Sequence, residues 1–176
     1  HGLIAVLATS MKVGASVCAS SGFNALKFLD LARLEKITWY SGVPTMHQAI
    51  LLRANKNKEA AKNLNLRLIR SSSASLPPAV FKDLNEAFNC PVIEAYGMTE
   101  ATHQMTSNPL PPKQQKAGFV GLPAGPEVCI MSENGDMMKQ GEEGEVCIKG
   151  ENVTLGYENN EDCLLYTSPS PRDRTT

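Results

Sequence analysis

This sequence of 176 residues lacks the cysteine patterns that zinc sites or disulfide scaffolds need. No two cysteines have Cys-x-x-Cys spacing, and their number is odd: they are Cys18, Cys90, Cys129, Cys147 and Cys163. We therefore expect neither a structural zinc site nor a disulfide framework, and a reducing compartment fits better. Residues 152–154 match a glycosylation acceptor triplet, but such triplets arise often by chance and nothing else suggests secretion.

An excess of charge and a long hydrophobic run are also missing. The sequence has 17 basic and 18 acidic residues, a net charge of −1, so no basic excess points to nucleic acid. The apolar opening stretch, residues 1–17, is interrupted by Ser10, Lys12 and Gly14 and is too short to span a membrane. With 42% hydrophobic residues, the chain can build a globular core.

Several common catalytic motifs are absent from the sequence. There is no Gly-x-Ser-x-Gly elbow, no Gly-x4-Gly-Lys-Ser/Thr loop, no Gly-x-Gly-x-x-Gly turn and no His-Glu-x-x-His pair. The sequence therefore lacks the signatures of α/β-hydrolases, P-loop proteins, dinucleotide-binding folds and zinc proteases.

The first 112 residues alternate between helical and extended patterns. Apolar spacing and turn residues predict helices at residues 1–11, 25–36, 45–54 and 79–88. Short β-branched or apolar runs predict strands at residues 15–19, 37–40, 66–70 and 91–95. This alternation predicts an α/β fold with a largely parallel, helix-flanked sheet.

The rhythm changes at the Pro- and Lys-rich stretch 107–118. After it come three short strand patterns separated by turn signals: GFVG (118–121), EVCIMS (127–132) and GEVCIKG (144–150). We therefore expect an α/β subdomain at residues 1–112 and part of a small antiparallel, barrel-like β subdomain at residues 113–160. Residues 161–176 lose all periodicity, and we expect them to be a disordered, non-native tail.

Two loops follow predicted strands and carry polar or small residues. These are SSSASLPP (71–78) and EAYGMTEATH (94–103). Ligands of open parallel sheets bind at the carboxyl ends of strands, so the two loops face one crevice if their strands are neighbours in the sheet.

The residue types in these loops suit a nucleotide. Tyr96 offers an aromatic face, and Gly97 permits a tight turn. Thr99 can donate a hydrogen bond to phosphate, and Glu100 can bind Mg²⁺. Each of these residues also has a structural explanation, as a packing aromatic or an ordinary helix start, and the pattern alone does not separate the two.

The motif from Tyr96 to Glu100 (YGMTE) resembles the adenylate-binding motif of the AMP-forming acyl-CoA synthetase superfamily, to which luciferase and adenylation domains belong. Four further segments resemble superfamily motifs in the family's order: His1-Gly2, residues 71–76, residues 118–123 and residues 144–157. The five matches cover nearly all of residues 1–157. The resemblance implies the fold predicted above.

The resemblance also implies roles for single residues. Ser72, Ser73 and Ala74 would line adenine on one side, with Ala95 and Tyr96 on the other, and Gly97 would also belong to the cofactor-binding residues. Thr99 would bind the phosphate of AMP, Glu100 would hold Mg²⁺ in catalysis, and His1 would lie by the acyl pocket. The implied cofactors are ATP/AMP, Mg²⁺ and CoA. The implied partner is a small carboxylic acid, which is first joined to AMP and then transferred to CoA.

Within the superfamily, residues 37–51, 69–78 and 94–112 are most similar to the oxalate–CoA ligase group. A small dicarboxylate needs hydrogen-bond donors for its second carboxylate, and His1, Ser73 and His103 are candidates. The alternatives are a fatty-acid or aromatic-acid CoA ligase and a noncatalytic nucleotide-binding remnant. The group implies a cytoplasmic or peroxisomal enzyme. Since superfamily motifs expected before His1 and after Tyr157 are absent, we expect a fragment that is inactive alone.

Overall fold

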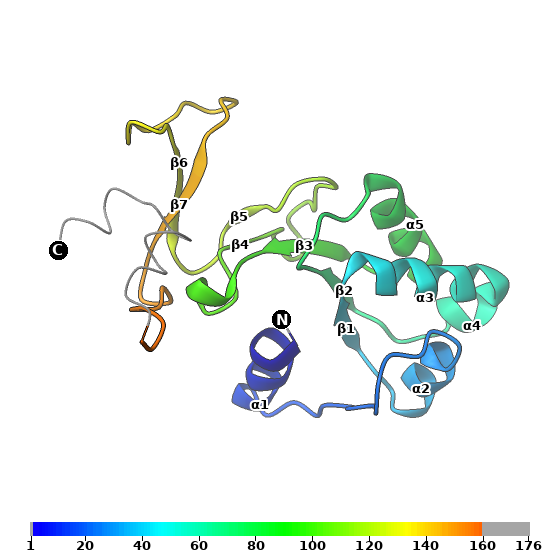
Figure 1. Cartoon of the computed structure of the whole chain (residues 1–176). Coiled ribbons are helices and arrows are strands. Elements are labelled where there is room, and N and C mark those ends of the chain that lie inside the picture. Colours follow the sequence, from blue (N-terminus) through cyan, green and yellow to red (C-terminus); the bar gives the residue numbers. More distant parts are fainter. Residues whose placement is uncertain (1, 160–176) are drawn as a thin grey trace. The chain divides into compact units, whose positions relative to one another are not determined.

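The computed structural model of the chain describes residues 2–159 (Figure 1). His1 and residues 160–176, which include the predicted tail, lie outside the described residues. Backbone contacts divide the chain into two compact units. Residues up to Tyr96 form the first unit together with Thr106–Leu122. Gly97–Met105 and the described residues from Pro123 onward form the second. The subdomain boundary at residues 112/113 stays a prediction.

The first unit is built on a sheet whose strands follow the order β1-β2-β3-β4-β5. The strands β1 (Trp39–Gly42), β2 (Leu68–Ser71) and β3 (Val92–Tyr96) are parallel neighbours. The short β4 (Thr106–Ser107) is antiparallel to β3, and β5 (Leu122–Pro123) comes last in the order. The predicted α/β class with a parallel sheet is thus confirmed.

Three helices of the first unit precede β1 in the sequence, and three lie between its parallel strands. They are η1 (Gly2–Ala8), α1 (Thr9–Lys12), α2 (Phe28–Leu34), α3 (Pro44–Lys56), α4 (Lys58–Lys62) and α5 (Pro78–Phe88). The helices α3 and α5 lie side by side (Figure 1). Their buried residues, among them Ile50, Ala54, Leu84 and Phe88, form one core with Ile69 and Val92 of the sheet. Both helices begin at a proline, a residue that favours the first helical turn.

The predicted strand at residues 15–19 is wrong. The structure has no strand there, and all five residues are exposed. Val17 is the only residue of this stretch with a strong strand preference, and no strand pairs with it.

The second unit contains the short 3-10 helix η2 (Thr99–Ala101) and the antiparallel strands β6 (Glu127–Met131) and β7 (Glu145–Lys149). Both long strands were predicted, and they run side by side in Figure 1. Among the described residues they form a two-stranded sheet and not a closed barrel. The predicted strand at residues 118–121 is wrong, because Gly118 and Gly121 have φ angles of 76° and 84° and so leave the extended conformation.

The cysteines at positions 18, 90, 129 and 147 are thiols, and Cys163 lies outside the described residues. Within residues 2–159, no helix has both the length and the apolar character needed to cross a membrane.

Glu94 on β3 is a buried acid, only 4% exposed, that connects three segments of the first unit. Its Oε1 accepts a hydrogen bond from the Leu76 amide (3.1 Å), and its Oε2 accepts one from the Gly118 amide (3.0 Å). Its backbone carbonyl accepts a third from the Asn108 amide (2.8 Å). This one residue therefore ties the loop after β2 and the connection after β4 to the centre of the sheet.

His47 on α3 is fully buried against β1. Its Nδ1 lies 3.2 Å from the hydroxyl of Tyr40, and a Cβ at Gly42 would lie 3.2 Å from its Cε1. Burial raises the pKa of Tyr40, so its hydroxyl stays protonated and shares this hydrogen bond with a neutral imidazole. Burial also lowers the pKa of His47 from 6.5 to about 4.

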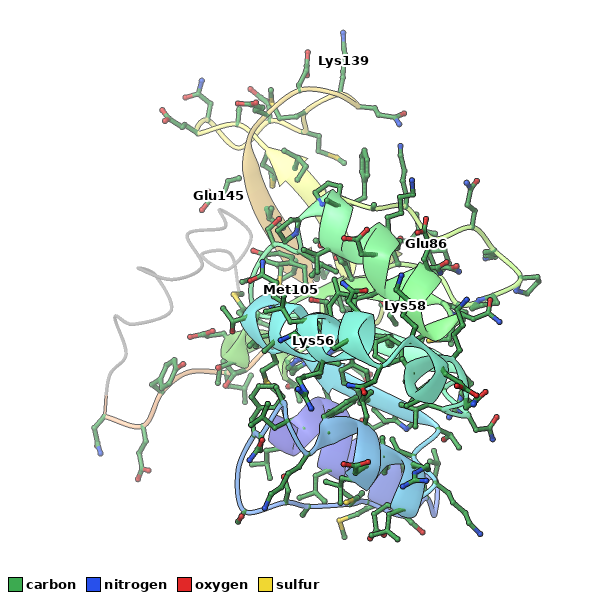
Figure 2. The ribbon with its side chains drawn as sticks, turned by 90° about the vertical axis from the view of Figure 1, so that its right-hand side faces the viewer. Lys56, Lys58, Glu86, Met105, Lys139 and Glu145 are labelled. Atoms are coloured by element: carbon green, nitrogen blue, oxygen red, sulfur yellow. The ribbon has the colours of Figure 1, made fainter. Side chains whose placement is uncertain are left out.

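We predict that Glu94→Ala destabilises the fold by about 2 kcal/mol, because it leaves the fully buried Leu76 amide without its acceptor. The matched control is Glu86→Ala on α5 (Figure 2), which removes only an exposed ion pair with Lys82 and is worth less than about 1 kcal/mol. Urea unfolding followed by the fluorescence of the single tryptophan, Trp39, measures both values. Equal losses in the two variants would contradict the structural role of Glu94.

We predict that the protein loses stability as the pH falls from about 7.5 to about 5, with a contribution of about 2 kcal/mol from His47. In this range the unfolded state, with a His47 pKa near 6.5, takes up a proton that the folded state, with a pKa of about 4, does not. The unfolded state is therefore favoured as acidity increases.

Urea unfolding at several pH values measures this slope. The control variant His47→Asn keeps a polar group near Tyr40 but does not titrate, so its slope should be shallower, whatever its absolute stability. A slope equal to that of the unmodified protein would show that His47 is not the group responsible.

Candidate functional site

The purine side of the predicted site lies in the first unit, at the carboxyl ends of β2 and β3. Ser71 at the end of β2 is in register with Glu94 on β3. The loop that begins at Ser72 and the last two residues of β3, Ala95 and Tyr96, therefore lie at the same edge of the sheet.

The two sides of this edge present different surfaces. Ser72 is buried, and its amide donates to the Gly42 carbonyl (3.3 Å). Ser73 and Ala74 are exposed, and Ser73 has a left-handed φ of 75°. Ala95 is buried at 5% exposure, whereas Tyr96 is 39% exposed. Backbone and small side chains on β2's loop and an accessible phenol ring on β3 are thus available to a planar ligand.

The phosphate side of the predicted site lies in the second unit, in the turn from Gly97 to Gln104. A side chain at Gly97 would overlap the carbonyl oxygen of His103, so the backbone of this turn closes on itself where only glycine fits. The amides of Thr102 and His103 donate to the carbonyls of Thr99 (3.1 Å) and Met98 (3.0 Å). Thr99, the first residue of η2, is exposed, while Glu100 and His103 are half-buried.

Glu100 is bonded to a segment about fifty residues further along the chain. Its Oε1 accepts a hydrogen bond from the Tyr157 hydroxyl (2.6 Å), and its backbone carbonyl accepts one from the Thr154 amide (2.7 Å). Within residues 2–159, no group of three or more His, Cys, Asp or Glu side chains lies close enough to hold a metal ion. Mg²⁺ is commonly bound through one or two carboxylates, with phosphate oxygens and water completing its shell, and Glu100 can supply one such oxygen.

The predicted site residues thus fall into two local groups. Ser72, Ser73, Ala74, Ala95 and Tyr96 belong to the first unit, and Gly97, Thr99, Glu100 and His103 to the second. His1 lies outside the described residues. The roles of all these residues in binding stay predictions.

Sequence reasoning missed two residues whose side chains bond to the backbone in or beside these groups. They are Glu94, which bonds to Leu76, and Asn152, which bonds to Ala101 and Gln104. Asn152 lies inside the segment 144–157, which resembles a superfamily motif. That resemblance does not indicate which residues the segment contacts. Glu94 lies two residues before the YGMTE motif. An acidic residue within an otherwise apolar strand pattern is the signal that could have identified it.

Comparison with known proteins gives a consistent result. The sequence profile of the AMP-binding enzyme family matches residues 1–158. Oxalate–CoA ligase of Arabidopsis thaliana is 48% identical over 163 residues, which cover 91% of this chain and 32% of that protein. Oxalate–CoA ligase of Saccharomyces cerevisiae is 46% identical, with 91% and 29% covered.

Solved structures show the same relationship. ATP-bound MatB from Rhodopseudomonas palustris superposes with a TM-score of 0.80 at 30% identity, covering 90% of this chain and 31% of that one. A benzoate CoA ligase from Burkholderia xenovorans superposes with a TM-score of 0.78 at 25% identity, with 88% and 31% covered. The chain spans about a third of the length of the curated relatives it matches. The family profile and the close relatives together show that this chain belongs to the AMP-binding enzyme family.

Proposed function

We propose that the complete protein containing this chain is an ATP-dependent acid–CoA ligase that activates a small dicarboxylic acid of the oxalate type. The observation that carries the proposal is the register of β2 and β3, which brings the serine-rich loop and Tyr96 to one edge of the sheet. The 46–48% identity to two oxalate–CoA ligases supports the choice of acid.

The purine would bind at this edge. The exposed Ser73 and Ala74 let a flat ring approach the backbone, and the accessible ring of Tyr96 can stack on the other face of the base. Glu94 holds the loop in place through the Leu76 amide, so the surface is formed before the nucleotide arrives.

The phosphates would bind at the turn from Gly97 to Gln104. The exposed Thr99 can donate its hydroxyl proton to a phosphate oxygen, and Glu100 can take part in binding Mg²⁺. When bound, Mg²⁺ would neutralise charge on the phosphates. The protein would then orient the acid so that its carboxylate attacks the α-phosphorus of ATP. Pyrophosphate leaves, and the CoA thiolate subsequently displaces AMP from the acyl group.

The second carboxylate of the acid needs donors, because a buried charge without partners is costly. The half-buried His103 ends the same turn that carries Thr99 and Glu100, and Ser73 is exposed on the loop after β2. We propose that His103 favours a short dicarboxylate over a fatty acid, and the resemblance makes Ser73 and His1 further candidate donors.

We expect Glu100→Gln, made in the complete protein, to lower acid-dependent release of pyrophosphate by on the order of 100-fold. It should also raise the Mg²⁺ concentration needed for the half-maximal rate, because the amide is a poorer ligand than the carboxylate. Glu143→Gln, an exposed change in another turn of the second unit, is the control and should have no effect. An unchanged rate and Mg²⁺ requirement in Glu100→Gln would refute the metal role.

We expect His103→Ala to lower kcat/KM for oxalate by roughly 10- to 100-fold while leaving that for a medium-chain fatty acid unchanged. His103→Gln keeps a side-chain donor and should retain part of the preference. Both substrates are compared with the same preparation of the complete protein. If the ratio of the two kcat/KM values does not change, His103 does not select the acid. If the unmodified protein prefers the fatty acid or an aromatic acid, the assignment to oxalate fails.

A further inference from the structure

The turn that carries Thr99, Glu100 and His103 has a strained backbone. Thr102 and His103 have φ angles of 46° and 83°, and neither residue is glycine. Two consecutive left-handed residues of this kind cost on the order of 1 kcal/mol each or more, so contacts from outside must hold the turn in this form.

Asn152 makes these contacts from about fifty residues away in the same unit. Its Nδ2 donates to the carbonyls of Ala101 (2.8 Å) and Gln104 (3.1 Å), which lie immediately before and after the two strained residues. Its backbone carbonyl accepts a hydrogen bond from the Thr102 hydroxyl (2.6 Å). The side-chain amide of Asn152 thus bonds to the backbone on both sides of the strained pair, and its main-chain carbonyl bonds to Thr102.

The surrounding segment is shaped to present this amide. The Thr154 amide, two residues after Asn152, donates a hydrogen bond to the Glu100 carbonyl and so makes a further contact with the same turn. The Val153 amide closes a tight turn onto the Gly150 carbonyl (3.1 Å). A Cβ at Gly150 would lie 2.8 Å from Asn152 Oδ1 and 2.9 Å from Pro126 Cα, so a side chain there would displace the asparagine.

We propose that Asn152 is a positioning residue that holds Glu100 and His103 in their working geometry. This inference rests on the proposed function for its catalytic consequence and on the contacts above for its structural part. Both protons of one nitrogen are needed, because the two acceptors are carbonyl oxygens on either side of the strained pair. The same bonds engage the nitrogen that N-linked glycosylation would modify, so glycosylation of the acceptor triplet and this arrangement exclude each other.

The test compares Asn152→Asp and Asn152→Ala with the control Asn134→Asp, all in the complete protein. Asn134 lies exposed in a turn of the same unit, so the control makes the same chemical change away from the site. Asn152→Asp keeps the shape of the side chain but sets a carboxylate against two carbonyl oxygens.

The first measurement is hydrogen–deuterium exchange of the peptide 98–105. The amides of Thr102 and His103 should exchange at least about tenfold faster in both Asn152 variants, while those of β6 and β7 should not change. On acidification the carboxyl of the Asn152→Asp variant gains one O–H donor, so its protection should partly return relative to Asn152→Ala at the same pH. Unchanged exchange in both Asn152 variants would overturn the proposal.

The second measurement is acid-dependent pyrophosphate release. Both Asn152 variants should need more Mg²⁺ and show a smaller ratio of kcat/KM for oxalate to that for a medium-chain fatty acid, each by about tenfold. Faster exchange with an unchanged Mg²⁺ requirement and an unchanged ratio would overturn the positioning role. If the unmodified protein releases no pyrophosphate with any acid, the proposed function fails, and the catalytic role of Asn152 fails with it. The exchange experiment still decides whether Asn152 holds the turn.

Discussion

The parallel pairing of β2 with β3 is the constraint on which the purine side of the site depends. Once Ser71 is in register with Glu94, the chain must leave both strands at the same edge, whatever the loops contain. A shift of β3 by one residue would turn both Glu94 and Val92 to the opposite face of the sheet, away from their buried partners. The hydrophobic core therefore fixes the register, and the register places the loop after β2 beside Ala95 and Tyr96.

The parts of the fold that the sequence predicts are those in which local preference and packing agree. The helix α5 begins at Pro78, within one residue of the predicted start, and its apolar face supplies Phe81, Leu84 and Phe88 to the core. The sequence fails where a strand needs a partner that periodicity does not reveal, as at residues 15–19. It also fails at residues 118–121, where two left-handed glycines interrupt an apolar run that looks like a strand.

For the candidate site, the sequence predicts residue types but not the contacts that hold them. Tyr96, Thr99 and Glu100 are recognisable because they stand together within five residues. Asn152 is not, because its contacts with Ala101 and Gln104 span about fifty residues of sequence and depend on how the turn folds. The left-handed conformation of Thr102 and His103 is equally invisible, since neither residue type demands it. Strain of this kind arises from tertiary structure, and only coordinates reveal it.

Glu94 accepts hydrogen bonds from backbone amides, whereas Asn152 donates hydrogen bonds to backbone carbonyls. The backbone groups at each position therefore determine which side chain is needed. The loop after β2 turns the Leu76 amide inward, where it requires an acceptor, and a carboxylate oxygen provides one. The turn after η2 presents two carbonyls, which require donors, and a carboxylate there would repel both. A primary amide is the smallest side chain that offers two protons from one atom. Each residue is therefore matched in sign to the backbone groups around it, and exchanging a carboxylate and an amide at these positions is not a conservative change.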